Sequence, residues 1–194
     1  PYDNVEVRKA LSMAVDRSMM VKVAMHNTTR PADATGLSDA YIRYKNQDTA
    51  VGQWTAHDPS TAVRLLDEAG LKLGPDGWRR RPNGKAWRVY VNVPTGFSDW
   101  VRAAQVITRD LKNVGIDARI KAYDFNAWYE KLQEGDYELS LGWSEVGPTP
   151  YRFFKSQLSA KSVRPVGEMA VANWHRFGLS AADEALRGFE EALD

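Results

Sequence analysis

Apolar residues recur at helical spacing near the start of the chain. Asp3 and Glu6 have the spacing of a capping box, which predicts that a helix begins here and continues to Asp16. One face of this helix carries four apolar residues: Val7, Ala10, Leu11 and Ala14. Because these positions lie three or four residues apart, the helix is expected to pack that face against a core.

A second helix is marked at both ends. Asp58 is a capping residue, Pro59 suits the first helical turn, and Gly70 is placed to end the helix. Its apolar stripe consists of Ala62, Leu65, Leu66 and Ala69. The preceding residues 26–57 show no sustained period, and we expect a long loop with short helical pieces there.

A β-hairpin is predicted after this helix. Asn83 and Gly84 separate two runs with strand character, which is typical of a type I′ turn. Trp78 and Trp87 flank the turn and are expected to pair across it. The three arginines at 79–81 are interpreted as a solvated strand end, because nucleic-acid binding requires a wider basic surface.

From residue 87 onward the apolar period alternates between strand and helix. Strands are predicted at 87–93, 116–122 and 137–141, and helices at 99–113 and 125–134. This βαβαβ order predicts an α/β fold with a mainly parallel sheet, right-handed crossovers and flanking helices, to which the hairpin is added. Ligands of such sheets bind at the carboxyl ends of the strands, so the loops there are candidates for a binding site.

The composition of the 194 residues fits one large globular domain or two small ones. Hydrophobic residues make up 43% of the chain, which is enough for a packed core. The net charge is +1, so no overall field favours nucleic acid, and we expect no nucleic-acid partner. The chain has no cysteine, which excludes disulfides and thiolate metal sites, and no apolar run of about 18 residues that would span a bilayer.

The stretch LGWSEVGPTPY follows the last predicted strand and combines aromatic, acidic and proline residues. Two interpretations are open: a stiff connection whose Trp143 enters the core, or a binding loop in which Trp143 and Tyr151 form walls of a site. Trp128 shares an apolar helical stripe and is assigned to the core. A second stacking face is expected from one of two further tryptophans, Trp174 or Trp100.

The segment ANWHRFG places amide, indole, imidazole and guanidinium groups together. Four polar side chains are candidates for hydrogen bonds to a ligand: Asn173, His175, Arg176 and Glu145. The alternative is an irregular segment with a satisfied histidine and a surface arginine. The histidines lack metal-ligand spacing, and no Gly-rich phosphate loop or nucleophile motif is present, so no metal, cofactor or catalytic residue is predicted.

Four segments resemble, in the same order, motifs of the family 5 extracellular solute-binding proteins, the peptide, nickel and oligosaccharide receptors of bacterial ABC importers. These segments are VEVRKALSMAVDR, AVRLLDEAGLKLGPDGW, YEKLQEGDYELSLGW and FGLSAADEALRGFEEALD. The resemblance implies a periplasmic or membrane-anchored extracellular receptor whose two lobes close around a solute and deliver it to a membrane permease. It also implies that residues 1–194 form a single α/β lobe, the carboxy-terminal one, excised from a longer monomeric protein.

The segment after Gly142 and Trp143 bears on the class of solute. In many peptide receptors of the family it carries an aspartate before a proline, and the resemblance implies that such an acid holds the amino terminus of the peptide. Here that aspartate is absent, and GPTPY with PVGEMAVANWHRF resembles the cellobiose and β-oligosaccharide receptors. We therefore expect a cellobiose-like oligosaccharide as the solute.

Two alternatives stay open for the function. An oligopeptide or dipeptide receptor would use Glu145 as the anchor for the amino terminus. A carbohydrate-active enzyme would need two carboxylates, such as Glu145 with Asp124 or Glu168, but a chain with 25 acidic residues offers many such pairs. The protein is therefore expected to be a receptor without enzymatic activity.

Overall fold

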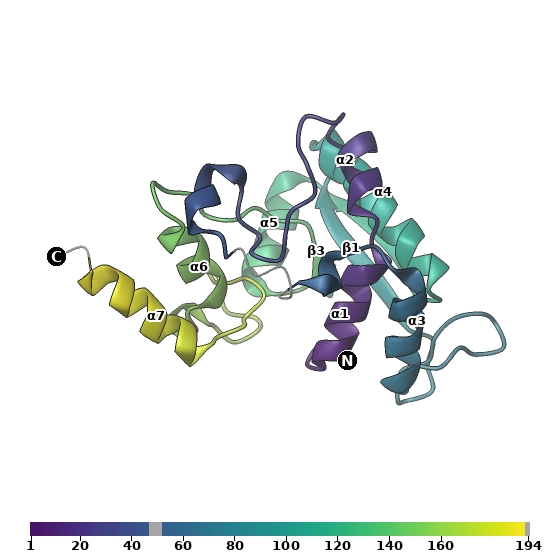
Figure 1. The fold of residues 1–194 in the computed structure, drawn as a ribbon. Helices are drawn as coiled ribbons and strands as arrows, with labels where there is room; N and C mark the ends of the chain where they lie inside the picture. The colour runs from purple at the N-terminus through teal and green to yellow at the C-terminus, as the bar shows by residue number, and fades with distance from the viewer. Residues whose placement is uncertain (47–51, 193–194) are drawn as a thin grey trace.

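The computed structural model describes residues 1–46 and 52–192. Figure 1 shows a small sheet with α1, α3 and α4 on one side of the view and α6 with α7 on the other. The strands are β1 (Arg88–Pro94), β2 (Asp117–Tyr123) and β3 (Leu139–Ser140). The helices are α1 (Val5–Ala14), α2 (Arg17–Val23), α3 (Pro59–Glu68), α4 (Ser98–Asn113), α5 (Phe125–Glu134), α6 (Tyr151–Leu158) and α7 (Ser180–Glu191). Short 3-10 turns are η1 (Asp39–Tyr44), η2 (Gln53–Thr55) and η3 (Ala160–Ser162).

The sheet has β1 in the centre, with β2 and β3 paired to it in parallel on either side. Parallel neighbours need a crossover, and α4 accordingly joins β1 to β2 while α5 joins β2 to β3. The predicted βαβαβ order and the parallel sheet are confirmed, and the boundaries of α4, α5, β1 and β2 agree with the prediction within one residue. Only β3 is shorter than predicted.

Alternate residues of β1 point to opposite faces of the sheet. On one face β1 buries three valines: Val89, Val91 and Val93. The last two of these pack against Ala104 of α4. On the other face, Tyr90 and Asn92 border a pocket together with Lys131 of α5. α4 and α5 therefore cover opposite faces of the sheet.

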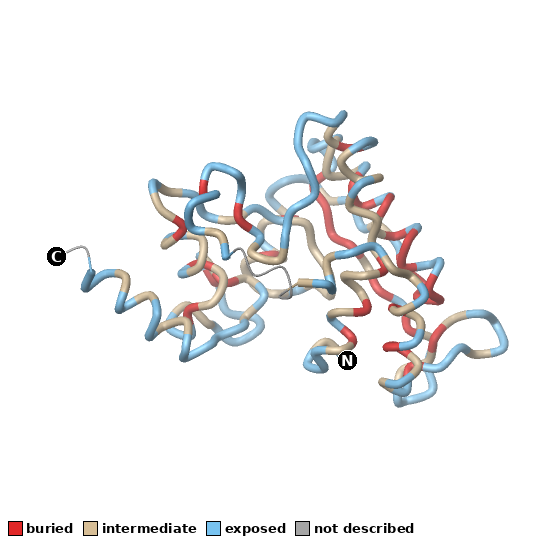
Figure 2. The backbone as a smooth tube through the Cα atoms, viewed as in Figure 1, coloured by how far each residue is buried: buried red, intermediate tan, exposed pale blue. Residues whose placement is uncertain are grey.

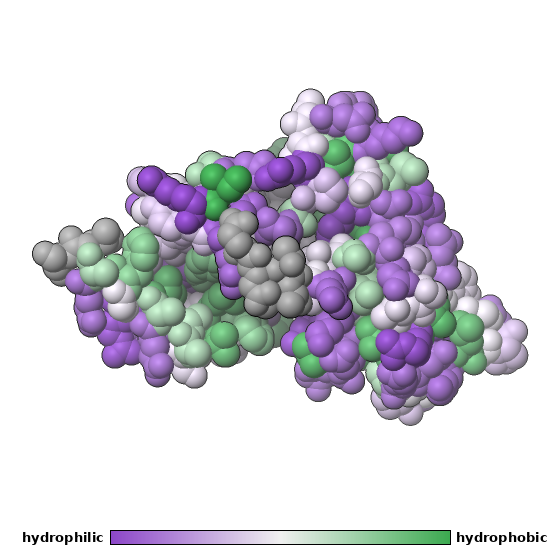
Figure 3. All heavy atoms as spheres, in the orientation of Figure 1, coloured by the Kyte–Doolittle hydropathy of each residue, from purple (hydrophilic) through white to green (hydrophobic). Residues whose placement is uncertain are grey.

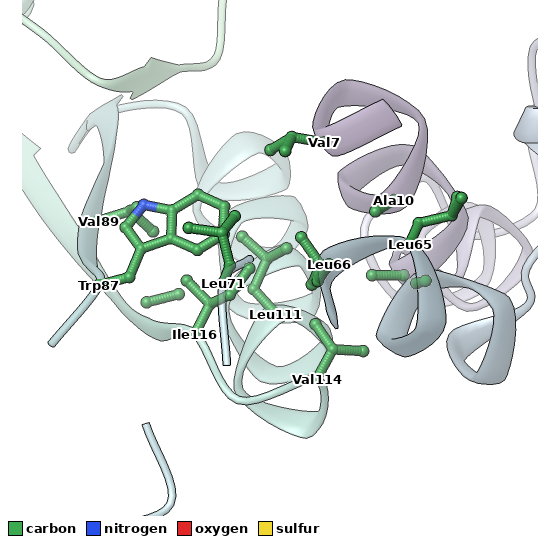
Figure 4. Packing of buried hydrophobic residues seen from close by; sticks show 13 residues of the cluster. Val7, Ala10, Leu65, Leu66, Leu71, Trp87, Val89, Leu111, Val114 and Ile116 are labelled. Carbon is green, nitrogen blue, oxygen red and sulfur yellow. The ribbon is translucent and has the colours of Figure 1, made fainter. Parts of the chain in front are cut away.

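The largest core packs α1 and α3 against α4 and the beginning of β1, as Figure 4 shows. Trp87 is fully buried in it, among aliphatic side chains that include Val7, Leu66, Leu111 and Ile116. These contacts account for the apolar stripes of the two predicted helices. Figure 2 places most buried residues around this core and the sheet.

The connection before β1 is a tight turn whose geometry differs from the prediction. The backbone N–H of Gly84 donates to the carbonyl of Arg81 at 2.8 Å, and that of Arg81 donates to the carbonyl of Lys85 at 2.9 Å. Gly84 has φ +77°, whereas Asn83 is not among the residues with positive φ. The type I′ prediction is wrong because Pro82 fixes a negative φ and becomes a central turn residue, which moves the left-handed position to the glycine.

Arg79 is fully buried, so interpreting it as part of a solvated strand end is wrong. Its Nε donates to the carbonyl of Val114 at 2.6 Å, and its Nη1 donates to Asp67 at 2.7 Å. The backbone N–H of Trp87 donates to the carbonyl of Arg79 at 2.6 Å, so Trp87 lies opposite Arg79, not opposite Trp78. The expected tryptophan pairing is therefore also wrong.

The first predicted helix corresponds to α1, and α2, which was not predicted, follows it directly. The side chain of Asn4, rather than that of Asp3, caps α1 by accepting the backbone N–H of Glu6 at 2.9 Å. This helix ends at Ala14, and Asp16 then caps α2. Asp3 and Asn4 are both suitable capping residues. The prediction chose Asp3 because its spacing to Glu6 matches a capping box, whereas Asn4 is the cap in the structure.

α6 and α7 pack against each other at a distance from the main core, at the left of Figure 1. α7 has no buried residue, and Figure 3 shows hydrophobic residues interspersed with hydrophilic ones over this part of the molecule. The loop between α2 and α3 contains η1 and η2, which confirms the predicted short helical pieces within residues 26–57 as far as the structure describes that range. That residues 1–194 form one excised lobe stays a prediction.

Candidate functional site

Aromatic residues from all three strand ends meet at the carboxyl edge of the sheet. Phe97 lies just after β1, Phe125 just after β2 and Trp143 just after β3. They form one network of ring contacts, which we call the aromatic cluster: Phe97, Trp100, Phe125, Trp128, Tyr129, Trp143 and Trp174. The topology thus brings together the loops in which a parallel sheet binds ligands.

Trp143 is the central ring of this cluster. It stacks nearly parallel to Phe125, with centroids 6.3 Å apart at 5°, and to Tyr129, at 5.6 Å and 22°. Trp174 meets it edge-on at 5.4 Å and 90°. The ring contacts hold the indole in place while 38% of the residue stays exposed. A fixed and partly open indole is suited to stacking on an apolar surface of a ligand.

Two further tryptophans, Trp128 and Trp100, contact the ring of Trp143. Trp128 is fully buried, as predicted, and its indole N–H donates to Ser140 Oγ at 3.1 Å. Trp100 of α4 is half-buried and meets Trp128 edge-on, with centroids 5.8 Å apart. Trp100 also contacts Trp143 at 6.3 Å. It therefore lies in the cluster, and its role as a stacking face stays a prediction.

Asn173 is engaged within its own segment. It is 2% exposed, and its Nδ2 donates to the carbonyls of Ser159 at 3.1 Å and Phe177 at 2.8 Å. Its Oδ1 accepts the backbone N–H of Phe177 at 3.1 Å. These bonds stabilise a backbone with φ +50°, which asparagine tolerates better than most residues. A hydrogen bond from Asn173 to a solute would have to replace one of them.

Arg176 ties its segment to α5. Its Nη1 donates to the carbonyl of Trp174 at 2.6 Å, and its Nη2 donates to the carbonyl of Gln133 at 2.8 Å. A side chain at Gly135 would come within 2.6 Å of the guanidinium, so glycine at the end of α5 leaves room for it. Arg176 thus positions Trp174 against the cluster, and direct contact with a solute stays a prediction.

His175 lies beside the carbonyl of Gln157, 2.7 Å from its Nε2. The surrounding protein lowers the pKa of His175 because it disfavours the charged imidazolium, while the carbonyl of Gln157 opposes this effect. The lowered pKa favours the neutral form of the ring, and the predicted contact of His175 with a solute stays a prediction.

Tyr151 lies apart from the aromatic cluster. Its ring stacks on Phe189 of α7, with centroids 5.8 Å apart at 20°. Its hydroxyl contacts Glu190 and accepts a hydrogen bond from Lys155 at 2.8 Å. These contacts join α6 to α7, so the structure gives Tyr151 a packing role, and its predicted role as a wall of the site is untested.

Glu145 is exposed next to the aromatic cluster. It makes no ion pair with any other residue in 1–46 or 52–192. Together with Trp143 and Trp174 it borders a small pocket of about 10 Å³. That volume admits about one water molecule. A solute would therefore have to lie on the surface of this chain rather than inside it.

Tyr41 is a residue of this region that the sequence did not reveal. Its hydroxyl donates to the carbonyl of Gly147 at 2.7 Å and accepts the backbone N–H of the same residue at 3.0 Å. Tyr41 is buried in η1, so it holds the loop that carries Trp143 and Glu145. In the sequence, Tyr41 was recognisable only as an aromatic residue within a stretch that lacks helical or strand periodicity.

Neither a metal centre nor a membrane span is found in the part of the chain that the structure describes. Within residues 1–46 and 52–192, no three histidine or carboxylate side chains are grouped to hold a metal ion. In the same ranges, no helix combines the length and apolar character that crossing a bilayer requires.

A family comparison decides what class of protein this is. The sequence model of the bacterial extracellular solute-binding proteins, family 5 Middle, matches residues 1–164. The chain belongs to this family. The resemblance found in its motifs is thereby confirmed at the family level, and its α/β fold is shared with a periplasmic binding protein of known structure.

Individual relatives are mostly peptide-binding proteins by name. The chain is 27% identical over 189 residues to di/tripeptide-binding protein 2 of Pseudomonas aeruginosa, covering 96% of the chain and 32% of that protein. It is 28% identical to the dipeptide-binding protein of Escherichia coli, covering 82% of the chain and 28% of that protein. It is 34% identical to the glutathione-binding protein GsiB of Salmonella choleraesuis, covering 84% of the chain and 32% of that protein.

A solved structure with the same fold comes from Thermotoga maritima. It is a periplasmic oligopeptide-binding protein of an oligopeptide ABC transporter, with a TM-score of 0.85 and 25% identity over 96% of this chain and 35% of that one. A second structure of that protein contains mannohexaose. The chain thus spans about a third of the length of its relatives.

Proposed function

We propose that this chain is part of the solute-binding component of a bacterial ABC importer, which closes around its solute and delivers it to a membrane permease. The family membership of the chain supports this proposal. The full-length protein would work outside the cytoplasmic membrane, either in the periplasm or anchored to the outer side of a membrane. The carboxyl edge of the sheet would form one wall of its binding site.

The solute proposed is a short peptide. The names of the relatives favour this alternative over the oligosaccharide that the loop sequence suggested. The observation that carries it in this chain is the exposed carboxylate of Glu145, without an ion pair in the described residues and beside the fixed indole of Trp143. Glu145 would pair with the amino terminus of the peptide, and Trp143 would contact an adjacent side chain.

Calorimetric titration of the full-length protein tests this proposal. Dipeptides, tripeptides and β-linked oligosaccharides are titrated into the native protein and into two variants, Glu145→Gln and Glu184→Gln. The second variant is the control, because it makes the same change at an exposed position of α7. Closure of the full-length protein around a peptide would bury the pair of Glu145 with the amino terminus, and loss of one partner of a buried charge pair costs about 3 kcal/mol, so Glu145→Gln should weaken peptide binding by more than about 100-fold. Peptide binding that Glu145→Gln leaves unchanged would remove the anchor from the proposal.

An oligosaccharide is the second candidate solute. The mannohexaose bound to the Thermotoga relative and the open aromatic face at Trp143 favour it. In this case Trp143→Ala should abolish oligosaccharide binding, whereas Glu145→Gln should have a small effect because a neutral polyol has no charge to pair. Analysis of the sugars after incubation tests the enzymatic alternative, since turnover that depends on Glu145 would contradict a receptor.

A further inference from the structure

A second pocket lies on the face of the sheet that α5 covers. It has a volume of about 250 Å³ and is bordered by residues of β1, β2 and the α5–β3 connection. α5 separates it from the aromatic cluster, because Lys131 borders the pocket whereas Tyr129 of the same helix contacts Trp143. The pocket is therefore distinct from the proposed solute site.

Asn92 is the most informative residue of this pocket. It is 4% exposed, and its side chain makes no hydrogen bond with any residue in 1–46 or 52–192. Its backbone carbonyl accepts the N–H of Leu141 at 3.0 Å, which fixes the residue in the centre of the sheet. The amide is not among the enclosed side-chain groups that lack a partner, so it reaches the space of the pocket that Asn92 borders, where its donor and its acceptor are available to a ligand.

The charged groups around the pocket are largely matched among themselves. Asp136 forms an ion pair with Lys131 at 2.5 Å, and Glu138 pairs with Arg81. The ammonium of Lys121 lies over the ring of Tyr90, 4.5 Å from its centroid. Both carboxylates at the pocket are thus paired, and the charge left over is the single ammonium of Lys121 on the Tyr90 ring, so hydrogen-bonding groups predominate around the space.

We propose that this pocket binds a neutral polyhydroxylated molecule with the size of one sugar ring. The amide of Asn92 can donate to one hydroxyl and accept from its neighbour, and the phenol groups of Tyr123 and Tyr137 border the same space. Pockets for drug-sized ligands measure about 300–1,000 Å³, so the volume fits a smaller molecule. This pocket is separate from the site proposed for a peptide or an oligosaccharide at the aromatic cluster.

Saturation-transfer NMR on the full-length protein tests this inference with methyl β-D-glucoside as the probe. The native protein should bind the glucoside, and Asn92→Leu should weaken binding by about tenfold or more, since the buried bonds to the ligand are lost. Tyr123→Phe, which removes one hydroxyl and preserves the packing, should weaken it several-fold. Tyr44→Phe, at an exposed tyrosine of η1, is the matched control and should have no effect.

The outcomes separate this pocket from the proposed solute site. Asn92→Leu should leave peptide or oligosaccharide titration unchanged, and Trp143→Ala should leave glucoside binding unchanged. If the glucoside does not bind the native protein, or if Trp143→Ala abolishes its binding while Asn92→Leu and Tyr123→Phe do not, the inference is wrong. Selective binding of glucuronate or glucosamine in place of the glucoside would overturn the choice of a neutral ligand. If Asn92→Leu fails to fold, Tyr123→Phe against Tyr44→Phe decides the result.

Discussion

At the scale of single residues, Arg79 shows how a charged side chain can belong to the interior. Besides Val114 and Asp67, its guanidinium donates to the carbonyl of Leu71 at 2.6 Å. One side chain thus joins the end of α3, the turn before β1 and the end of α4. Three consecutive arginines in the sequence give no indication of which one is buried, because the choice depends on carbonyls that converge only in the folded chain.

We predict that Arg79→Met destabilises the full-length protein strongly. The change removes the partner of Asp67, which is 39% exposed, and leaves the buried carbonyls of Val114 and Leu71 without their donor; each unsatisfied buried acceptor costs about 1–3 kcal/mol. Arg64→Met is the control, because Arg64 forms an exposed ion pair with Glu68. This change should lower the free energy of unfolding by less than about 1 kcal/mol. Urea denaturation measures both, and equal effects would contradict the role assigned to Arg79.

His175 gives a prediction about pH. Its pKa is lower in the folded protein than in the unfolded chain, so the unfolded chain binds more protons as the pH falls. Stability should therefore decrease as the pH falls below about 6.5, the ordinary pKa of histidine. Denaturation at several pH values checks this, and His175→Gln should remove that part of the pH dependence. A histidine whose NMR titration lies above its ordinary pKa would reverse the sign.

At the scale of elements, the strands and helices from residue 87 onward were predictable because their apolar period alternates cleanly. The type of the turn before β1 was predicted wrongly. Asn83 and Gly84 are a strong signal for a type I′ hairpin turn, but Pro82 fixes its own backbone angle and shifts the turn by one residue. The loop around Gly147 was not predictable in its conformation. Its position depends on Tyr41, which is 106 residues away in the sequence.

Tyr41→Phe should weaken solute binding without unfolding the protein. The variant keeps the buried ring and loses both hydrogen bonds to Gly147, each worth about 0.5–1.5 kcal/mol, so the loop with Trp143 and Glu145 would lose its fixed position. We expect an affinity lower by about tenfold in calorimetric titration of the full-length protein. Tyr44→Phe in the same 3-10 turn is the control, and an equal loss there would contradict the role of Tyr41.

At the scale of the whole molecule, the residues predicted for one site lie in different surroundings. Trp143, Trp174 and Trp100 lie together in the aromatic cluster, whereas Tyr151 packs against α7 and Asn173 is enclosed in its own segment. The sequence could indicate these tryptophans because each occurs in a predicted loop or at the end of a predicted element. It could not indicate Asn173 as enclosed, because its amide bonds backbone groups of Phe177 and Ser159 whose positions are set only by the folded loop.

The 194-residue chain should bind the solute much more weakly than the full-length protein. Its candidate site is an open surface beside a pocket of about 10 Å³, so opposing contacts would have to come from the remainder of the protein. We expect an affinity lower by about 100-fold or more when both are titrated with the same solute, with circular dichroism to verify that the shorter chain is folded. Equal affinities would show that closure around the solute contributes nothing.

The aromatic cluster also gives the protein an optical signature. Trp100, Trp128 and Trp143 have ring centroids 5.4–6.3 Å apart in fixed orientations. Near-ultraviolet circular dichroism responds to such fixed packing and disappears when it is lost. The four indoles that meet here, with Trp174, should therefore dominate that spectrum, and a molecule that settles on Trp143 should change the emission of the whole group. Solute binding could then be followed by the intrinsic tryptophan fluorescence of the protein, without an attached fluorophore.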